Sequence, residues 1–413
     1  MNREKYTQWL RETTVSVVQS RIDSVKRKDV VRTGLRMYDG SVIGVAGAIG
    51  NYRDTELEEK ARKAMGRGIT YPWKLSEGRT EKVHVPFDLP EGKAFVGEME
   101  VVLEELRSRH PELIFSNNGK LTCSTSVLEN DMGLALEYRS CSVSIALGFK
   151  HRDSTSIMDG FTGFGGAFRY NRDDAIRELC RGCEAFGKPV ALPEGSSVMP
   201  IVFSAGDPLF WRKLRSDLSG HQFGTGSSLL SGKTGQKIFD EKFSVTQTAD
   251  HMICPQRFFD AEGVVNNDYR YPLIENGSLR AVYTDRRTSD RFDLPLTGAA
   301  GSAYDGVPVL VPPDLRIEDT GKTLKELLNG EQGIFIVFAI GGDFTPQGDF
   351  ATPVQLSYLF DGEKFIGRLP ELQISSSVFE MFGENYSGCS TDSLSRLCDD
   401  RYVVAVMDVE KMN

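Results

Sequence analysis

The spacing of hydrophobic and polar residues along the first half of the chain predicts both helices and paired strands. Residues 1–27 carry charges among apolar positions and predict a helix. Residues 31–45 alternate around Asp39-Gly40, a dipeptide typical of a two-residue hairpin turn. Apolar residues at helical spacing predict three further helices, at 55–66, 97–109 and 173–186.

Between the last two of these helices the hydrophobic period changes to two. Leu121, Cys123, Thr125 and Val127 alternate with polar residues, as in a half-buried strand. After a turn at Asn130-Asp131, two more strand-like runs follow at 133–139 and 142–149. These runs together predict a β-meander.

The second half of the chain is richer in strand-like runs. A short polar stretch with Pro and Gly at 188–197 separates it from the first half. We therefore expect an α+β protein of two domains: an N-terminal mixed α/β domain with the β-meander over residues 1–190, and a C-terminal β-rich domain over residues 191–413. The second domain is predicted to contain a helix at 207–218 and strands at 199–203, 271–275, 279–284, 333–340 and 402–408.

Charge and cysteine usage narrow the class of protein. The net charge is −9 and no basic run is interleaved with aromatic residues, so direct nucleic-acid binding is disfavoured. Residues 1–18 have no apolar core of a signal peptide, and no stretch is long and apolar enough for a membrane span. Seven cysteines without a framework spacing favour a reducing compartment. We expect a cytoplasmic protein.

Short motifs that suggest chemistry are each incomplete. Gly232-Lys233-Thr234 resembles the end of a phosphate-binding loop, but Ser227 stands where that loop needs Gly. Cys180 and Cys183 form a C-x-x-C without a second pair, and His251 and Cys254 form a lone pair of soft ligands. The sequence contains no G-x-S-x-G and no H-E-x-x-H. No self-contained catalytic constellation follows from the residues alone.

Five segments of the second half, in order, resemble blocks of the TldD/PmbA peptidase family. The segment Leu273-Ile274-Glu275-Asn276-Gly277-Ser278-Leu279 is nearly identical to the family's LIENGxL strand. The other four are weaker singly, but their order and spacing agree: 231–235, 259–264, 297–301 and 342–350. We therefore identify the chain as resembling this family over most of its length.

The resemblance implies the register of a zinc motif. Active, TldD-like members carry H-E-x-x-x-H on a helix about twenty residues before the first block, and in this chain those three positions hold Trp211, Arg212 and Ser216. Indole offers only a donor, guanidinium is a permanent cation, and a serine hydroxyl is a poor neutral ligand. His221 falls where it cannot restore the pair. The active branch also uses a Cys near the C-terminus, a region that here contains Cys389 and Cys398.

The resemblance implies a metal-free TldE/PmbA-like subunit, from the branch also called modulators of DNA gyrase. Such a subunit would assemble with a TldD-like metallopeptidase subunit that processes unfolded peptides, and would itself lack zinc, any other cofactor and activity. A homodimer is also consistent with the family.

Two alternatives remain open. One is a stand-alone hydrolase that uses another site, for which the candidate residues of the cleft are His221, His251, Cys254, Asp260 and Glu262. The other is a non-enzymatic module that captures extended peptides by adding a strand to a sheet edge.

Overall fold

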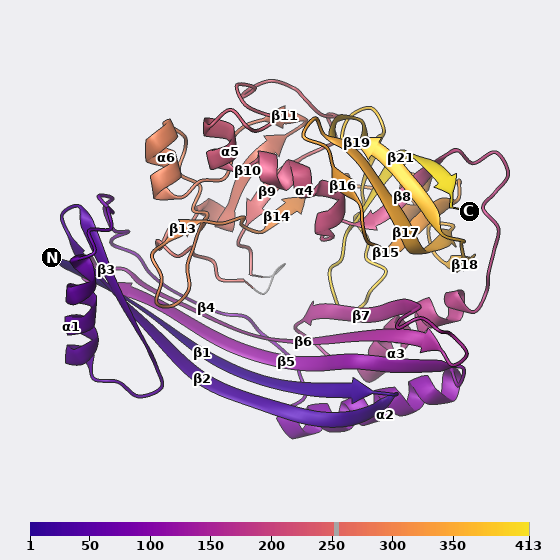
Figure 1. The fold of residues 1–413 in the computed structure, drawn as a ribbon, viewed down its shortest axis with the longest axis horizontal. Helices are drawn as coiled ribbons and strands as arrows, with labels where there is room; N and C mark the ends of the chain where they lie inside the picture. The colour runs from indigo at the N-terminus through magenta and orange to yellow at the C-terminus, as the bar shows by residue number, and fades with distance from the viewer. Residues whose placement is uncertain (252–255, 413) are drawn as a thin grey trace.

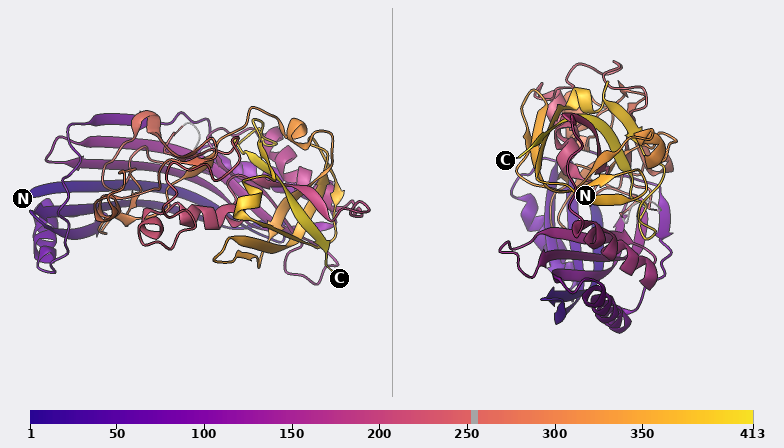
Figure 2. Two further views of the ribbon diagram at one scale, coloured as in Figure 1. Left: turned by 90° about the horizontal axis from the view of Figure 1, so that it is seen from above. Right: turned by 90° about the vertical axis from the view of Figure 1, so that its right-hand side faces the viewer.

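The computed structural model describes residues 1–251 and 256–412. A long, curved sheet from the first half of the chain lies below a second group of strands and short helices from the second half (Figure 1). Seen from above, the second half covers the long sheet mainly at the end away from the N-terminus (Figure 2).

The first half forms a seven-stranded sheet in the order β3-β2-β1-β5-β6-β4, with β7 also paired to β6. All its pairings are antiparallel except that of β4 with β6. Its elements are β1 Asn2–Val18, β2 Arg21–Asp39, β3 Val42–Ile49, α1 Asp54–Met65, β4 Thr80–His84, α2 Gly92–Arg109, β5 Leu113–Asn130, β6 Ala135–His151, β7 Gly160–Ala167 and α3 Arg172–Phe186.

The second half contains an eight-stranded sheet, a four-stranded sheet and the two-stranded pair β12-β13. Its elements are β8 Val198–Ser204, α4 Pro208–Asp217, α5 Gly220–Gly224, β9 Val245–Thr248, the 3-10 turn η1 Asn267–Tyr269, β10 Arg270–Glu275, β11 Ser278–Leu279, α6 Arg286–Phe292, β12 Ala300–Gly301, β13 Val309–Leu310, β14 Leu315–Ile317, α7 Leu324–Leu328, β15 Gly333–Ala339, β16 Asp343–Phe344, β17 Asp349–Phe360, β18 Phe365–Arg368, β19 Leu372–Ser377, α8 Val378–Met381, β20 Tyr386–Cys389 and β21 Tyr402–Lys411.

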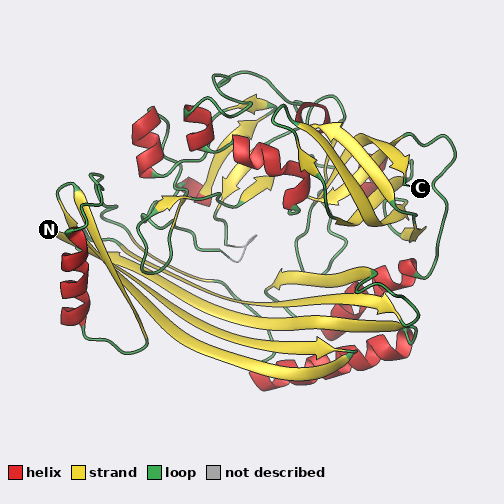
Figure 3. Ribbon diagram, in the orientation of Figure 1, coloured by secondary structure: helices red, strands yellow, loops and turns green. Residues whose placement is uncertain are grey.

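Helices α2 and α3 cover one face of the long sheet at its broad end (Figure 3). The apolar stripe of α2 buries Phe95, Met99, Val102, Leu103 and Leu106. Met99, Val102, Leu103 and Leu106 recur at the three- and four-residue spacing of one helical face. The opposite face of the sheet is turned toward the second half.

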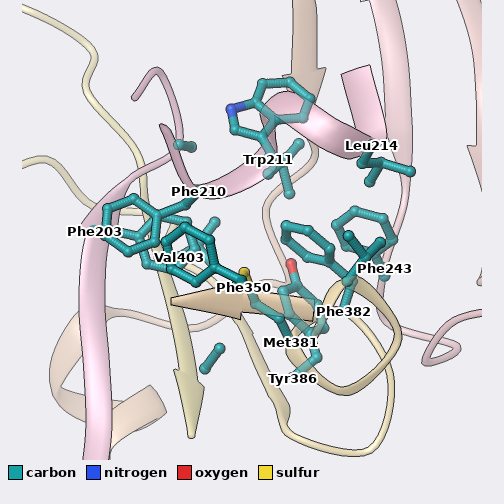
Figure 4. Packing of buried hydrophobic residues seen from close by; sticks show 14 of the residues in the cluster. Phe203, Phe210, Trp211, Leu214, Phe243, Phe350, Met381, Phe382, Tyr386 and Val403 are labelled. Carbon is teal, nitrogen blue, oxygen red and sulfur yellow. The ribbon is translucent and has the colours of Figure 1, made fainter. Parts of the chain in front are cut away.

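The second half has its own core, in which α4 packs against the eight-stranded sheet. Phe203 of β8 and Phe210 of α4 stack with ring centroids 4.2 Å apart, and Phe350 of β17 lies next to Phe210 at 5.6 Å. Figure 4 shows this aromatic cluster beneath the α4 ribbon.

Buried polar contacts join the two halves. The guanidinium of Arg36 on β2 is 2% exposed and donates to the Ala261 carbonyl oxygen at 2.5 Å, while also pairing with Glu4 at 2.9 Å. Nearby, the side chains of Phe258 and Phe259 pack among buried residues of the long sheet such as Tyr6. The two halves therefore share a packed interface where residues 258–261 meet β1 and β2.

The predicted helix at residues 1–27 is wrong, because this segment forms β1 and the start of β2. Thr13, Val15 and Val17 are buried in alternation, a strand period that the charged neighbours obscured. The turn between the strands is formed by Gln19 and Ser20, both with positive φ, without the Asn or Gly that normally reveals such a turn.

Other boundaries also differ from expectation. The runs at 133–139 and 142–149 form the single strand β6, and β7 was not expected. Helix α1 begins after Arg53, which provides no side-chain cap. Of the expected strand 279–284, only Leu279 lies in a strand, β11, and α2 begins at Gly92 rather than at residue 97.

The α+β class is confirmed, as are the Asp39-Gly40 hairpin and helices α3 and α4. Division of the chain at residues 190 and 191 stays a prediction. A disulfide joins Cys123 of β5 to Cys141 of β6, which are directly opposite in the strand register. This bond runs against the expectation that the cysteines remain reduced.

Candidate functional site

Helix α4 contains Trp211, Arg212 and Ser216, the three residues that we expected at the zinc-motif positions. Asp207 caps its first turn by accepting a hydrogen bond from the Leu209 amide at 2.9 Å, and Pro208 occupies the first helical position, where its missing N–H costs nothing. The backbone leaves helical geometry at Trp211, with φ −132° and ψ 19°. The kink separates the first turn from the rest of the helix.

Trp211 is a core residue. Its side chain is 1% exposed and belongs to the same cluster as Phe210 and Leu214 (Figure 4). The Arg215 guanidinium lies over the indole, 5.1 Å from the ring centroid. The indole Nε1 atom is buried without a hydrogen-bond partner among the described residues. This position contributes packing, and its only polar atom is a donor that cannot bind a metal.

Arg212 points to the surface, where it makes an ion pair. Its guanidinium lies 2.7 Å from the Asp343 carboxylate and donates to the Gly342 carbonyl oxygen at 3.3 Å. The backbone N–H of Phe344 and the charge of Arg212 lower the pKa of Asp343. The side chain of Arg212 is therefore a cation held in an ion pair at the surface.

Arg212 and Ser216 line a pocket of about 750 Å³. Its walls come from α4, α5, α6 and residues 309–312. His221, the first candidate of the predicted cleft, also lines it, with its ring 6.0 Å from that of Phe292. We call it the arginine pocket, because four arginines line it: Arg212, Arg215, Arg287 and Arg291.

The residues of this pocket do not fit a zinc ion. No group of three or more His, Cys, Asp or Glu side chains is arranged to hold a metal within the described residues. Cys389 and Cys398 do not line the pocket; their thiols donate to the Ile317 and Gly165 carbonyl oxygens. Burial raises the pKa of both thiols to about 12, which keeps them protonated.

Asp260 holds the backbone together. One carboxylate oxygen accepts from the N–H groups of Glu262 at 2.8 Å and Val264 at 2.9 Å, and the other accepts from Ala300 N–H at 3.0 Å. Both carboxylate oxygens of Asp260 are therefore occupied by backbone donors.

Glu262 bridges the two halves of the chain. Its carboxylate accepts from the Tyr71 hydroxyl at 2.5 Å and from the Arg286 backbone N–H at 3.0 Å. The side chain is 2% exposed. Burial raises its pKa to about 7, and the Asp260 carboxylate acts in the same direction.

The structure does not bring the other predicted cleft residues into one site. The His251 ring packs against Tyr269, with centroids 5.2 Å apart. Its Nδ1 atom is buried and has no hydrogen-bond partner in the described part of the chain. Within the described residues, no hydrogen bond or ion pair joins His251 to Asp260 or Glu262. Cys254 lies outside the described residues.

Sequence reasoning missed three members of the arginine pocket, namely Arg215, Arg287 and Arg291. Two of them lie on α6, four residues apart and therefore on one face of the helix. The run Arg286-Arg287-Thr288-Ser289-Asp290-Arg291 carried that signal. The run by itself does not predict a pocket, because the other arginines of the pocket are on α4, about seventy positions earlier in the chain.

Comparison with known proteins identifies the scaffold. Residues 196–412 match the family model described as the PmbA/TldA metallopeptidase C-terminal domain. The match covers more than half of the chain, so the protein is built on a metallopeptidase-related scaffold. It belongs to the PmbA/TldD family, as the five ordered segments indicated.

Relatives in archaea extend this match beyond the C-terminal domain. A protein of Methanocaldococcus jannaschii is 24% identical over 387 residues, covering 90% of this chain and 88% of the relative. A protein of Methanothermobacter thermautotrophicus named metalloprotease is 25% identical over 280 residues, which is 65% of this chain and 60% of its own length. A zinc metalloprotease TldD homolog of Saccharolobus solfataricus is 27% identical over 147 residues, 35% and 33% of the two chains.

Solved structures share the whole fold. TldE from Thermococcus kodakarensis superposes with a TM-score of 0.82 at 17% identity, covering 100% of this chain and 97% of that chain. A Thermotoga maritima protein described as a proposed modulator of DNA gyrase gives a TM-score of 0.76 at 16% identity, covering 99% of this chain and 96% of that chain.

None of the helices in the described residues has the length and apolar character needed to cross a membrane.

Proposed function

We propose that this protein is the metal-free, TldE-like subunit of a peptidase assembly in which a TldD-like subunit supplies the zinc site and hydrolyses unfolded peptides. The observation that carries the proposal is the ion pair between Arg212 of helix α4 and Asp343 of strand β16. An arginine at this position repels a metal ion and cannot activate water near neutral pH.

The packing of Trp211 supports the same conclusion. A zinc ligand must present a lone pair to a shared open position, whereas Trp211 is buried among the core residues of the second half. Ser216 offers only a neutral hydroxyl. Restoring a metal site would therefore need at least three simultaneous changes, one of them in the core.

Two measurements test the proposal. Metal analysis of the purified chain should find zinc well below one ion per chain. Peptidase activity on an unfolded peptide should appear only after a family member that carries H-E-x-x-x-H is added, and should disappear with a chelator. Stoichiometric zinc in this chain, or chelator-sensitive hydrolysis by this chain alone, would contradict the proposal.

The stand-alone hydrolase has less support. Asp260 and Glu262 are buried and occupied by backbone and tyrosine donors, so neither carboxylate is free to activate a water molecule. Hydrolysis by the isolated chain that is lost in His251→Ala would favour this alternative over the subunit role.

We also propose a cytoplasmic location and an indirect route for any effect on DNA gyrase. The net charge of −9 opposes attraction to the phosphate backbone. We propose that a peptide processed by the assembly, and not this chain itself, acts on gyrase. Purified chain should therefore leave duplex DNA unshifted in a gel at physiological salt.

A further inference from the structure

The arginine pocket has a strong imbalance of charge. Four guanidinium groups line it, and the single carboxylate on its wall is that of Asp285. Asp285 is 2% exposed and already accepts the Thr288 N–H at 2.8 Å as the cap of α6. The protein as a whole is acidic, so this concentration of positive charge is local.

Three of the four arginines have no carboxylate partner. Arg212 pairs with Asp343, whereas Arg215, Arg287 and Arg291 make no ion pair within residues 1–251 and 256–412. Unpaired arginines that converge on one concave surface attract anions. Arg172, by contrast, pairs with Glu98 at 2.6 Å.

Each unpaired guanidinium rests on an aromatic ring. Arg215 lies over Trp211 at 5.1 Å, Arg287 over Trp73 at 5.7 Å, and Arg291 over Phe292 at 5.0 Å from the ring centroid. The ring attracts the cation and does not occupy its N–H donors. The donors are thus held in place for planar, bidentate acceptors such as carboxylates.

The apolar part of the pocket lining suits an extended chain. It contains Val309 and Val311, which are 47% and 36% exposed, and Pro312. Val309 belongs to β13, which pairs only with β12 among the described strands. The other edge of β13 has backbone groups that an added strand could pair with.

We propose that the arginine pocket binds acidic peptides, with the peptide carboxylates on Arg215, Arg287 and Arg291 and the peptide backbone along β13. The volume of about 750 Å³ is in the range of ligand pockets. This inference rests on the proposed function, since it names the class of peptide that the metal-free subunit would receive. Side-chain carboxylates and a terminal carboxylate have the same chemistry, so the test separates them.

Calorimetric titration of the full chain tests the pocket directly. One probe is an acetylated and amidated Gly/Ser peptide with several aspartates, a second replaces each aspartate with asparagine, and a third has no acidic side chain but a free C-terminal carboxylate. We expect the first to bind and the second not to bind, with affinity falling as salt is raised. Binding of the third would assign the site to chain ends.

Arginine variants give the matched controls. Arg287→Gln and Arg291→Gln should each weaken binding about tenfold, because each removes charge-assisted hydrogen bonds. Arg291→Lys should recover only part of the loss, since lysine keeps the charge without the planar fork. Arg62→Gln, an exposed arginine of α1 outside the pocket, should bind as the parent does.

The outcomes separate this inference from the proposed function. If the asparagine peptide binds equally well, if inorganic phosphate competes as strongly as the acidic peptide, or if Arg62→Gln weakens binding as much as the pocket variants, the inference is overturned. Because the titration needs neither zinc nor a partner, acidic-peptide binding by a chain that carries stoichiometric zinc would overturn the proposed function alone. Partner-dependent activity without such binding would overturn the pocket inference alone.

Discussion

Glu262 shows how one residue can link stability to pH. Its carboxylate is buried between Tyr71 of the first half and Arg286 of the second. Burial and the neighbouring Asp260 both favour the protonated form, so the folded state keeps a proton on Glu262 to higher pH than the unfolded chain does. Where the folded state binds more protons, stability falls as pH rises.

We expect the free energy of unfolding to decrease between pH 4.5 and pH 7 by as much as about 3 kcal/mol from Glu262, since one pKa unit corresponds to about 1.4 kcal/mol. Glu262→Gln should remove this decrease and should be at least as stable as the parent above pH 7. Denaturant unfolding of the parent and of Glu262→Gln across this pH range measures the decrease. Glu59→Gln, an exposed change on α1, should leave the pH profile unaltered; an unchanged profile in Glu262→Gln would refute the assignment.

Residue roles were predictable where they depend on local sequence. The bonds that Asp260 accepts from the N–H groups of Glu262 and Val264 are local, because the donors lie two and four residues away. The partner of Glu262 could not be predicted, because Tyr71 is 191 positions distant. The arginine pocket was missed for the same reason: only Arg212 stood in a motif.

At the scale of elements, α4 combines a core face and a pocket face around its kink. Trp211 and Leu214 face the core, whereas Arg212 and Ser216 line the pocket. Helical spacing predicted this helix almost to its ends, since Asp207 and Pro208 form a standard start. The kink was not predictable, because no Pro or Gly lies at residue 211.

Trp211→Ala should lower the free energy of unfolding by roughly 3–5 kcal/mol, because it leaves a large cavity in the core. Arg212→Ala, its neighbour on the same helix, should change it by less than about 1 kcal/mol, as expected for an exposed ion pair. Chemical denaturation of both variants provides the comparison. Equal, small losses would show that residue 211 is not a core position.

The first two hairpins of the chain turn at opposite ends of the long sheet and show where turn signals fail. Asp39-Gly40 places a glycine at φ 64°, and its turn was predicted. Gln19-Ser20 makes a similarly tight turn, but its signal is tertiary: Ser20 Oγ accepts the Phe115 N–H at 2.9 Å. A contact across 95 positions holds a turn that the local sequence does not favour.

At the scale of the whole molecule, the second half sits directly against the backbone of the long sheet. A Cβ atom added at Gly34 of β2 would lie 1.6 Å from the Tyr304 carbonyl oxygen. Backbone cannot give way as a side chain can, so only glycine permits this approach. Alternating hydrophobic and polar residues predicted some of the long strands. The packing of the second half against them could not be predicted, since the pattern within one segment does not specify which distant segment it contacts.

We expect Gly34→Ala to destabilise the protein by roughly 2 kcal/mol or more, because the segment around Tyr304 must move away from the sheet. Gly97→Ala, in the interior of α2 with no atom within 4 Å of the new Cβ, should stabilise it by about 0.5–1 kcal/mol. Thermal unfolding of both variants tests the contrast in sign. A neutral Gly34→Ala would mean that the halves do not meet at this point.

The bond from Arg36 to Ala261 also has a consequence for synthesis. The two residues are 225 positions apart, so the acceptor leaves the ribosome about 11–45 s after the donor at ordinary translation rates. During that interval, β1 and β2 can pair and Arg36 can meet Glu4, but the face that later contacts the second half stays open to water. A nascent chain of this protein should therefore bind chaperones until residues beyond 261 emerge, and protease protection of stalled chains should rise only past that length.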